Sequence, residues 1–548
     1  MKDKEKWVKD HALTPQKLEI AHHILLDMIN GSSLGAAQRR HPTPDGAGYL
    51  AKHFIVAEYY NMVESGMLEE NPALLASIRM KPVRTLSGVT TVTVLTRSHP
   101  CPGDCIFCPT DARMPKSYLP DEPGAARAVE NEFDPYRQVK ARLDSLEAVG
   151  HPTDKIELLI LGGTWDAYPR DYQEWFIRRC LDAMNGIESA NLKLAQQINE
   201  TANHRNVGLV IETRPDYIQP AELAWLRSLG VTKIQMGAQS LDEEILKKNR
   251  RGHTAAQTLA ATSLLRAAGY KTVLHWMPNL LGATPESDQT DFVRLWQGYC
   301  PDEIKIYPTQ LLETAELYRY WQNGEYQPYT MEELISLVAD IKPTVPVYCR
   351  INRIIRDIPS HHVVAGNRRT SLRQDAGEEM IRRGNMCRCI RCREVRGQQV
   401  ETSDLRLDDF IYDAAWAQEH FLQYVTPDDR IAGYLRLSLP DRVLNSRTSR
   451  LPAEALAAQQ DLMKAMPELE DAALIREVHV YGQSLGVGEE QSGAAQHRGL
   501  GRQLLEKAAE IARMNGFQRM AVISAIGTRL YYENRGFERG EFYQVKAL

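Results

Sequence analysis

The chain has 548 residues, of which 43% are hydrophobic and 25% are charged, and its formal net charge is −5. This composition is typical of a folded globular protein, and the length predicts about two to four domains. No apolar run approaches the roughly 18 residues that a membrane span needs. The N-terminal segment MKDKEKWVKDHALTPQ has no apolar signal-peptide core. We therefore expect a cytoplasmic protein that does not associate with membranes.

The elements expected along the chain point to an α/β protein. Residues 1–80 are expected to be helical, because apolar residues recur at helical spacing in 18–29 and 53–63. Strand patterns followed by helix patterns then recur at 89–97, 155–165, 206–216, 231–240, 271–280 and 303–310. This repeat predicts a parallel (β/α) barrel, complete or partial, over residues 81–345. In such barrels the chemistry lies at the carboxyl ends of the strands.

The remainder of the chain divides into two further regions. Residues 346–400 are rich in arginine and contain cysteine, and we expect them to form a small linker. Residues 401–548 are expected to form a second α/β domain, with strands in 430–440, 473–482 and 519–527 and a helix in 501–516.

A first cysteine triplet follows the first expected strand. Cys101, Cys105 and Cys108 have the spacing C-x3-C-x2-C, and three thiolates at this spacing can hold a 4Fe–4S cluster with one open iron. In radical-SAM enzymes that iron binds S-adenosylmethionine, and Phe107 is then expected to pack on its adenine. Zinc and incidental thiols are the alternatives. Zinc usually takes a fourth protein ligand, and the next cysteine is more than 70 residues away.

Polar and glycine residues at later strand ends are candidates for contacts with the same cofactor. Gly162 and Gly163 precede Thr164 where backbone groups would meet the methionine part of S-adenosylmethionine. Glu212, Arg214 and Gln239 also follow expected strands and could line the pocket. The alternative for the glycines is an ordinary strand-to-helix turn, and Glu212, Arg214 and Gln239, each taken alone, are more typical of structural polar residues.

The C-terminal region contains a second cofactor motif. Gln496, Arg498, Gly499 and Gly501 belong to QHRGLG, which opens a helix and could bind a pyrophosphate at the helix N-terminus. A strand precedes this motif and TRLYYENRGF (528–537) follows it, an order that resembles the GNAT acetyltransferase fold. That resemblance implies acetyl-CoA binding, with Tyr531 and Tyr532 as candidates near the thiol. A dinucleotide-binding loop is the alternative, but its G-x-G-x-x-G pattern is absent.

A second cysteine triplet lies in the arginine-rich stretch. Cys387, Cys389 and Cys392 are expected to bind a structural zinc ion. A second iron–sulfur cluster and incidental thiols remain alternatives, and Cys349, His361 and His362 are candidates for a fourth ligand. Between residues 350 and 396 there are twelve arginines against five acids. This excess predicts either contacts with phosphates or internal salt bridges between domains.

The chain resembles the Elongator catalytic subunit (third Elongator protein) family in its stand-alone prokaryotic form. The resemblance extends from about residue 81 to the end and is carried by these segments: KPVRTLSGV (81–89), ETRPDY (212–217), GAQS (237–240), NRRGHT (249–254), HWMPNL (275–280), KIYPT (305–309), RIIRDIP (353–359), CRCIRCREV (387–395), EVHVYG (477–482), QHRGLG (496–501) and YYENRGF (531–537). The first cysteine spacing differs from that of eukaryotic members, which place about nine residues between the first two cysteines. The geometry of that loop is therefore not carried over.

The resemblance implies modification of the wobble uridine, position 34, of tRNA to 5-carboxymethyluridine. In the implied mechanism a 5′-deoxyadenosyl radical activates the acetyl methyl group of acetyl-CoA, the carbon radical adds to C5 of uracil, and the thioester is hydrolysed. The implied partners are the tRNA anticodon stem-loop, which the helical residues 1–80 could help to bind, and an electron donor. The oligomeric state is open, and a homo-oligomer is compatible with the sequence. The alternatives are a protein lysine acetyltransferase with a structural barrel, a methylthiotransferase-like enzyme and a non-catalytic tRNA scaffold.

Overall fold

The computed structural model describes residues 12–43, 48–82, 85, 87–396, 400–441, 453–481 and 499–548. It separates into two compact units, one made of residues 1–90 and 140–155 and the other of residues 91–139 and 156–548. Among the described helices, none is long and apolar enough to cross a membrane.

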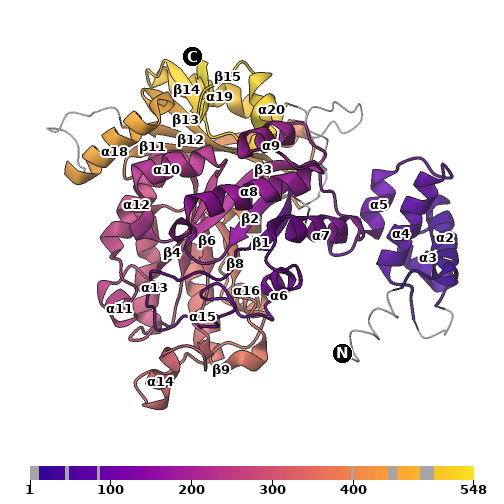
Figure 1. Cartoon of the computed structure of the whole chain (residues 1–548), viewed down its shortest axis with the longest axis horizontal. Helices are drawn as coiled ribbons and strands as arrows, with labels where there is room; N and C mark the ends of the chain where they lie inside the picture. Colours follow the sequence, from indigo (N-terminus) through magenta and orange to yellow (C-terminus); the bar gives the residue numbers. More distant parts are fainter. Residues whose placement is uncertain are drawn as a thin grey trace. The chain divides into compact units, whose positions relative to one another are not determined.

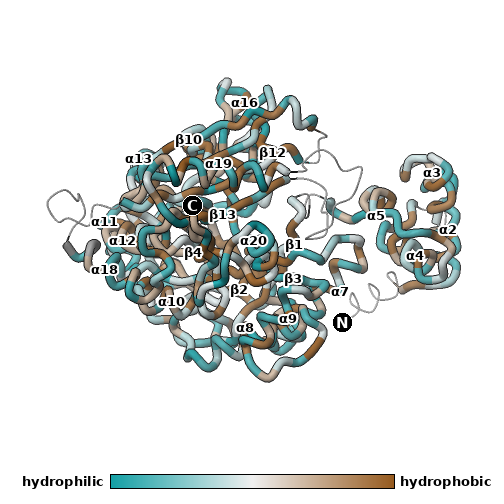
Figure 2. The backbone as a smooth tube through the Cα atoms, turned by 90° about the horizontal axis from the view of Figure 1, so that it is seen from above, coloured by the Kyte–Doolittle hydropathy of each residue, from teal (hydrophilic) through white to brown (hydrophobic). Residues whose placement is uncertain are grey.

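The first unit is built from short helices, as the spacing of its apolar residues predicts. Its helices are α2 (Pro15–Ile29), α3 (Leu34–Arg40), α4 (Lys52–Glu64) and α5 (Pro72–Ile78). Side chains of Thr14, Ser33 and Asn71 accept hydrogen bonds from first-turn amides, which satisfies groups that a helix leaves unpaired. Apolar and polar residues alternate along these helices (Figure 2), and the apolar ones form a core that includes Ile24, Leu25, Phe54, Ile55 and Ile78.

The barrel predicted from the sequence is a partial one. Its strands are β1 (Thr90–Leu95), β2 (Lys155–Leu161), β3 (Arg205–Thr213), β4 (Lys233–Gln239), β5 (Lys271–Trp276), β6 (Glu303–Ile306) and β8 (Arg350–Ile354). They form one sheet in the order β1-β2-β3-β4-β5-β6-β8, with β1 and β8 at its two edges. Every adjacent pair from β3 to β8 is parallel. The carboxyl ends of these strands therefore meet at the same edge of the sheet, where the predicted site residues lie.

Helices follow the strands of this sheet along the chain (Figure 1). They include α6 (Pro123–Glu130), α7 (Pro135–Glu147), α8 (Arg170–Asn185), α9 (Leu192–Asn199), α10 (Pro220–Ser228), α11 (Glu243–Lys248), α12 (Ala255–Ala267), α13 (Pro285–Arg294), α14 (Leu317–Gln322) and α15 (Met331–Ile341). Capping boxes at Thr254, Thr284 and Thr330 open α12, α13 and α15, which fixes where these helices begin.

The arginine-rich stretch begins inside the barrel sheet rather than after it. Strand β8 pairs in parallel with β6, although the sequence reading placed these residues in a linker. The alternation of polar Arg350, Asn352 and Arg353 with buried isoleucines hides the strand from a search for apolar runs. The stretch continues with β9 (Val363–Ala365), which pairs with β7 (Leu311–Leu312), and with α16 (Leu372–Arg382) and α17 (Ile390–Arg393).

A second seven-stranded sheet forms the C-terminal part of the chain. It contains β10 (Arg406–Ala414), β11 (Ala417–Val425), β12 (Ile431–Pro440), β13 (Ala472–Val480), β14 (Arg519–Val522), β15 (Glu538–Arg539) and β16 (Gln544–Ala547). The order is β10-β11-β12-β13-β14-β16-β15, in which only β13 and β14 pair in parallel. The helices of this part are α18 (Ala453–Ala465), α19 (Leu500–Met514) and α20 (Arg529–Glu533). Strands β12, β13 and β14 and helix α19 confirm the elements predicted there, whereas β10 and β11 were not predicted.

A buried network of charges joins the barrel to the C-terminal sheet. Asp302, which precedes β6, accepts hydrogen bonds from both Nη atoms of Arg476 on β13 at 2.8 and 2.7 Å. The same carboxylate lies 3.4 Å from Nη1 of Arg436 on β12, and Glu419 on β11 pairs with Arg476 at 2.7 Å. All four side chains are at most 1% exposed. Removing one partner of such a network leaves an uncompensated buried charge, so the network fixes how the two sheets pack.

Candidate functional site

The first cysteine triplet lies in the loop that leaves the carboxyl end of β1, as predicted. Cys105 is buried, and Cys101 and Cys108 are partly exposed. The backbone of Ile106 fastens this loop, since its amide donates to the carbonyl of Asn249 at 3.3 Å and its carbonyl accepts from the amide of Leu317 at 2.8 Å. These two backbone hydrogen bonds therefore hold the loop next to the carboxyl ends of the strands.

Phe107, the candidate for packing on adenine, is 8% exposed and belongs to an apolar cluster. The buried members of this cluster are Cys105, Ile106, Phe107, Ile245, Leu280, Leu281, Leu311, Leu317 and Tyr326. Its ring thus helps to anchor the cysteine loop on the barrel, a contact that does not depend on any ligand.

Arg251 joins the cysteine loop to the end of β4. Its Nη1 donates to Sγ of Cys105 at 3.5 Å, and its Nε and Nη2 donate to the carbonyl of Gly237 at 3.2 and 2.6 Å. A hydrogen bond from Cys108, followed by the charges of Arg251 and Arg214, lowers the pKa of Cys105. Thiolates are the form of cysteine that binds metals, so these surroundings fit a metal-ligand role.

Arg214, predicted as a cofactor contact, lies against the same loop. Its Nε donates to Asp216 at 2.9 Å and its Nη2 to the carbonyl of Arg251 at 3.0 Å. Its Nη1 is buried and has no hydrogen-bond partner among the described residues. A Cβ atom at Gly103 would lie 2.2 Å from this Nη1, so the close approach of loop and guanidinium requires glycine there. The free donor is suited to a carboxylate ligand such as that of an amino acid.

The Gly162–Gly163 turn follows β2 and reaches both the cysteine loop and the end of β1. The hydroxyl of Thr164 lies 3.9 Å from Sγ of Cys101. Gly162 and Gly163 have φ angles of 153° and 91°, and a Cβ atom at Gly162 would lie 1.9 Å from Oγ1 of Thr96. The turn therefore needs glycine for both conformation and space.

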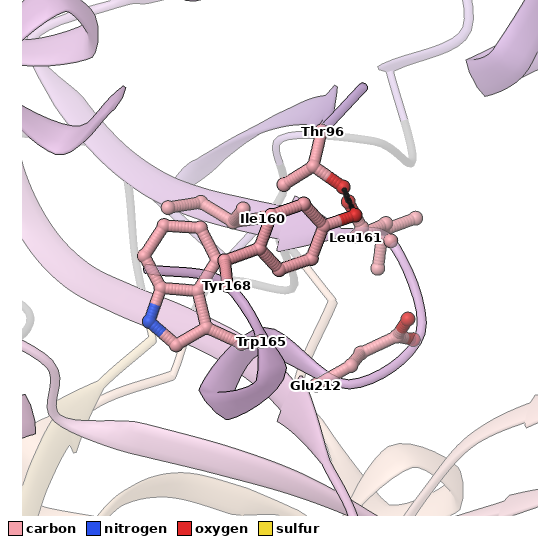
Figure 3. A pocket seen from close by; sticks show the side chains of 7 residues that line it. Thr96, Ile160, Leu161, Trp165, Tyr168 and Glu212 are labelled. Carbon is pink, nitrogen blue, oxygen red and sulfur yellow. Dashed lines mark hydrogen bonds between the residues drawn. The ribbon is translucent and has the colours of Figure 1, made fainter. Parts of the chain in front are cut away.

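A small pocket opens beside this turn (Figure 3). It is lined by Thr96, Ile160, Leu161, Gly162, Trp165, Tyr168 and Glu212. The hydroxyls of Thr96 and Tyr168 are 2.7 Å apart at its edge. Its empty volume, which includes space open to solvent, is only about 140 Å³. It brings Gly162 and Glu212 together, but alone it is too small to hold a nucleoside.

Glu212 and Gln239 occupy the ends of two other strands. Glu212 accepts a hydrogen bond from the hydroxyl of Tyr118 at 2.7 Å and lies 3.9 Å from Nζ of Lys305. Gln239 has a φ angle of 69°, and its Oε1 is buried without a partner among the described residues. A Cβ atom at Gly237 would touch both Gln239 and Arg251, which shows how closely these two side chains lie.

His253 is a neighbouring residue that sequence reasoning missed. Both of its ring nitrogens are buried without partners among the described residues. Burial, followed by the charges of Arg251 and Arg214, lowers its pKa, so the ring is neutral at pH 7. Arg251 and His253 both fall in the NRRGHT segment, and that segment was the available signal for them.

The C-terminal sheet splays open where the acyl-CoA motif was predicted. Strands β13 and β14 pair from Ala472–Arg519 to Ile475–Val522, and β13 then continues to Val480 along β12 alone. Helix α19 begins at Leu500 after Gly499, whose φ angle is 91°. A Cβ atom at Gly501 would lie 2.9 Å from the hydroxyl of Tyr531 and 3.8 Å from Val480. Gly501, Tyr531 and the end of β13 therefore meet at the N-terminus of α19, while Gln496 and Arg498 lie outside the described residues.

The two candidate tyrosines have different surroundings. The ring of Tyr531 packs under the guanidinium of Arg535, 3.5 Å from its centre, and its hydroxyl lies near the splay. Tyr532 is 7% exposed and belongs to the core between α19 and the sheet, where its ring meets Phe537 edge-on at 5.6 Å. The position of Tyr532 in the core makes it a packing residue, which leaves Tyr531 as the tyrosine at the splay.

The second cysteine triplet converges at the start of α17. The Sγ atoms of Cys387, Cys389 and Cys392 all lie within 4.8 Å of one another. A zinc ion bound to sulfur at about 2.3 Å places its ligands at roughly this spacing, so the triplet fits one tetrahedral ion. Among the described residues the first triplet does not form such a close group.

The histidines considered as a fourth ligand lie elsewhere. His361 and His362 place their Nε2 atoms 3.0 and 2.7 Å from Oδ2 of Asp121, forming a separate group. Cys349 is buried beside the triplet, where its carbonyl accepts from the amide of Ile390 at 3.0 Å. Its Sγ is not part of the close group of ligand atoms found among the described residues.

The arginine-rich stretch is mostly satisfied internally. Nine of its twelve arginines form an ion pair with a described carboxylate: Arg350, Arg353, Arg356, Arg369, Arg382, Arg383, Arg388, Arg393 and Arg396. Arg388 and Arg393 both bind Asp429 of the C-terminal domain, at 3.0 and 2.6 Å. Of the two alternatives for this stretch, internal salt bridges therefore account for most of its arginines. The pairs with Asp429 link the stretch to the C-terminal domain.

Comparisons with known proteins agree with this geometry. The sequence model of the Radical SAM superfamily matches residues 96–291, and that of the Radical_SAM C-terminal domain matches residues 301–382. A protein from Dehalococcoides mccartyi (strain CBDB1) named tRNA uridine(34) acetyltransferase is 41% identical, over 85% of this chain and 99% of its own length. Elongator complex protein 3 from Homo sapiens is 34% identical, over 87% of each chain.

A solved structure of an Elp3 protein is also similar to this chain. The archaeal Methanocaldococcus infernus Elp3 with an N-terminal deletion (1–46) has a TM-score of 0.69 and 36% identity, and the match covers 84% of this chain and all of that one. The chain belongs to the radical-SAM family of Elongator complex protein 3 and the tRNA uridine(34) acetyltransferases.

Proposed function

We propose that this protein is an enzyme that converts uridine 34 of tRNA to 5-carboxymethyluridine, with acetyl-CoA as the source of the added carbons. Membership of a family with members named tRNA uridine(34) acetyltransferase supports the substrate and the position. The radical-SAM match and the splayed C-terminal sheet support a reaction that uses two cofactor sites.

The residues around the first triplet fit an iron–sulfur cluster with S-adenosylmethionine. Cys101, Cys105 and Cys108 would hold the cluster, which with S-adenosylmethionine supplies a 5′-deoxyadenosyl radical. Arg251 holds the Cys105 sulfur and keeps its negative charge favourable. Arg214 and Gln239 offer buried polar atoms that have no partner in the described part of the chain, and such atoms suit the charged amino-acid end of S-adenosylmethionine.

The N-terminus of α19 would bind acetyl-CoA. Helix N-termini bind phosphate groups through their free amides and dipole, and α19 is long enough, at 15 residues, for this effect. Gly499 and Gly501 permit a close approach, and Tyr531 lies where the thioester end would enter the splay. The sequence motif adds Gln496 and Arg498, which lie outside the described residues, to this proposed site.

Charged side chains occur inside the half-barrel from β13 to the end of β3, and this observation carries the proposal. Glu303 binds Lys233 at 3.2 Å and Lys271 at 2.6 Å, and Lys271 in turn forms an ion pair with Glu477 on β13. One step nearer the carboxyl ends, Lys305 hydrogen-bonds Gln235 and approaches Glu212. A polar interior that runs from β13 toward the cysteine loop suits an acetyl group that must meet a radical made at the other end.

The remaining features support a tRNA enzyme. Cys387, Cys389 and Cys392 would hold a structural zinc ion that folds the segment between the domains. Arg368, Arg373 and Arg391 bind backbone carbonyls and have no ion pair with a described carboxylate, so they remain candidates for phosphate contacts. The helical first unit is proposed to contribute to tRNA binding.

The alternative function, acetylation of protein lysines, is less compatible with the packing of β13. Arg476 and Glu477 on this strand and Tyr481 directly after it contact barrel residues. A protein substrate would have to reach the thioester past these contacts.

Anaerobic incubation of the reconstituted protein with S-adenosylmethionine, acetyl-CoA, a reductant and tRNA tests the proposal. Nucleoside mass spectrometry should show 5-carboxymethyluridine together with 5′-deoxyadenosine. The C101A/C105A/C108A variant should form neither product. Unchanged tRNA-dependent consumption of acetyl-CoA in that variant would contradict the radical reaction.

A further inference from the structure

The part of β13 beyond the splay presents alternate side chains to the barrel. Glu477 forms an ion pair with Lys271 of β5, and its second oxygen accepts from Nε of Arg436 at 2.9 Å. The hydroxyl of Tyr481 lies 3.3 Å from Nη1 of Arg350 on β8 and 3.2 Å from Glu394. Because side chains alternate along a strand, His479 faces the same way as these two anchored residues. It lies between two contacts with the barrel.

The imidazole of His479 is held by contacts with aromatic rings, and these contacts leave its Nε2 atom unused. The ring stacks on Tyr434 at 5.6 Å and lies 4.5 Å from the ring of Tyr481. Its Nε2 is buried and has no hydrogen-bond partner among the described residues. A buried ring nitrogen without a partner is costly, and such groups often have a role with a ligand or water. The two aromatic contacts orient this nitrogen.

His479 is also next to the proposed position of the thioester. Val480 follows it directly and lies by Gly501 and the Tyr531 hydroxyl, where the sheet is splayed. The acyl group must extend from there toward the barrel for its methyl carbon to be activated. Val480 faces α19 and His479 faces the barrel, so an acyl group that extends past β13 toward the barrel would bring its carbonyl carbon to the side that His479 faces.

We propose that His479 is the general base that activates the water for thioester hydrolysis, the last step of the proposed carboxymethylation. This inference rests on the proposed function, because it concerns the thioester that remains after the acetyl carbon has joined uridine. The water oxygen attacks the thioester carbonyl while Nε2 takes its proton. The carbon–sulfur bond then breaks, the CoA thiolate takes that proton from the imidazolium, and the second water proton leaves with formation of the carboxylate.

The neighbouring ionisable groups are less suited to this role. Burial opposes ionisation of Glu477, but the charges of Lys271 and Arg436 outweigh it and lower its pKa to about 2. Burial raises the pKa of Tyr481 and of Tyr531, so both remain protonated at pH 7. Burial, with Lys271 and Arg350 nearby and Glu477 and Glu303 opposing them, lowers the pKa of His479 to about 4. The imidazole is therefore neutral and can act as a base.

The test separates the radical step from hydrolysis. Full-length wild type and the H479Q variant are incubated anaerobically with tRNA, S-adenosylmethionine, reductant and acetyl-CoA deuterated in its methyl group. Three products are measured: deuterium in 5′-deoxyadenosine, 5-carboxymethyluridine, and a tRNA–CoA thioester adduct, which hydroxylamine traps. A missing general base typically costs about 100-fold or more in rate. We expect H479Q to raise the ratio of adduct to 5-carboxymethyluridine by about that factor, and imidazole to lower this ratio again in H479A.

A matched control is His420→Gln. His420 is buried in the same sheet and binds Asp409 at 2.8 Å, and H420Q should keep the wild-type ratio of adduct to product. Formation of 5-carboxymethyluridine by H479Q at the wild-type ratio would overturn the inference, as would loss of deuterium transfer together with hydrolysis. Absence of deuterated 5′-deoxyadenosine in the wild type would instead refute the proposed function.

Discussion

Arg251 donates a hydrogen bond from Nη1 to Sγ of Cys105 at 3.5 Å while its other two donors hold the carbonyl of Gly237. One guanidinium thus ties the cysteine loop after β1 to the end of β4, on the other side of β2 and β3 in the sheet. The position of Cys105 therefore depends on a residue 146 positions away in the sequence.

The Arg251→Lys variant should lose this link. An ammonium group cannot hydrogen-bond both the sulfur and the carbonyl in the way that the forked guanidinium does. A hydrogen bond to a charged group contributes about 1.5–3 kcal/mol, so we expect at least about a 10-fold loss in reductive cleavage of S-adenosylmethionine. Iron and sulfide content and 5′-deoxyadenosine formation measure the effect. Arg250→Lys is the control, because Arg250 is more exposed and pairs with Glu316 at 2.8 Å. Equal effects of the two substitutions would argue against a special role for Arg251.

Substitution of a cysteine in the second triplet should cause a selective loss of zinc. Cys389→Ser removes the buried member of the triplet, and we expect loss of bound zinc and a lower thermal unfolding midpoint, because structural zinc contributes to folding. His362→Ala should retain zinc, since His362 contacts Asp121 rather than the cysteines. Elemental analysis of iron and zinc in both variants measures this. Loss of zinc in H362A would show that the histidine moves to the cysteines when metal binds.

The ion pair between Glu477 and Lys271 predicts a pH-dependent contribution to stability. The pKa of Glu477 is lowered from 4.5 to about 2 in the folded chain. The stabilisation is therefore complete above about pH 4.5 and is lost as the pH falls toward 2. A shift of this size corresponds to about 3 kcal/mol.

The variant E477Q should be less stable than the wild type at pH 7, and the difference should shrink as the pH falls through this window. Thermal unfolding midpoints between pH 3 and pH 7 measure it, with Glu506→Gln as an exposed control whose only described ion pair is to Arg502 on the same helix. A difference between E477Q and wild type that does not change with pH would contradict the assignment of the shift to this carboxylate.

The two tyrosines near the splay should differ in what they affect. Tyr531→Phe removes the hydroxyl near Gly501, and we expect a higher KM for acetyl-CoA of about 10-fold with the unfolding midpoint unchanged. Tyr532→Phe lies in the core, so its effect should be confined to stability and remain below about 1.5 kcal/mol. Kinetics at varied acetyl-CoA and thermal unfolding together separate the two. The reverse pattern would place Tyr532 at the thioester.

Local sequence patterns predicted much of the fold because the signals are short-range. The strands from β1 to β6, together with β12, β13, β14 and α19, follow from apolar periodicity and the loops that bound them. Strand β8 escaped because arginines and an asparagine occupy its polar face, and these side chains find partners only in the folded protein. Strands β10 and β11 were also not recognised, and the exposed face of β10 weakens its apolar pattern.

The sequence by itself determined the chemistry that this protein can carry. The spacing of Cys101, Cys105 and Cys108 predicts a site for an iron–sulfur cluster, and Gly499 and Gly501 predict a helix N-terminus that can bind a pyrophosphate, because both patterns depend on neighbours along the chain. Only the tertiary structure decided which distant residues act on these sites. It placed Arg251 on Cys105, Tyr531 rather than Tyr532 at the splay, and His479 between two contacts with the barrel. These choices depend on strand order and on which face of a strand is buried, and neither is encoded in a local pattern.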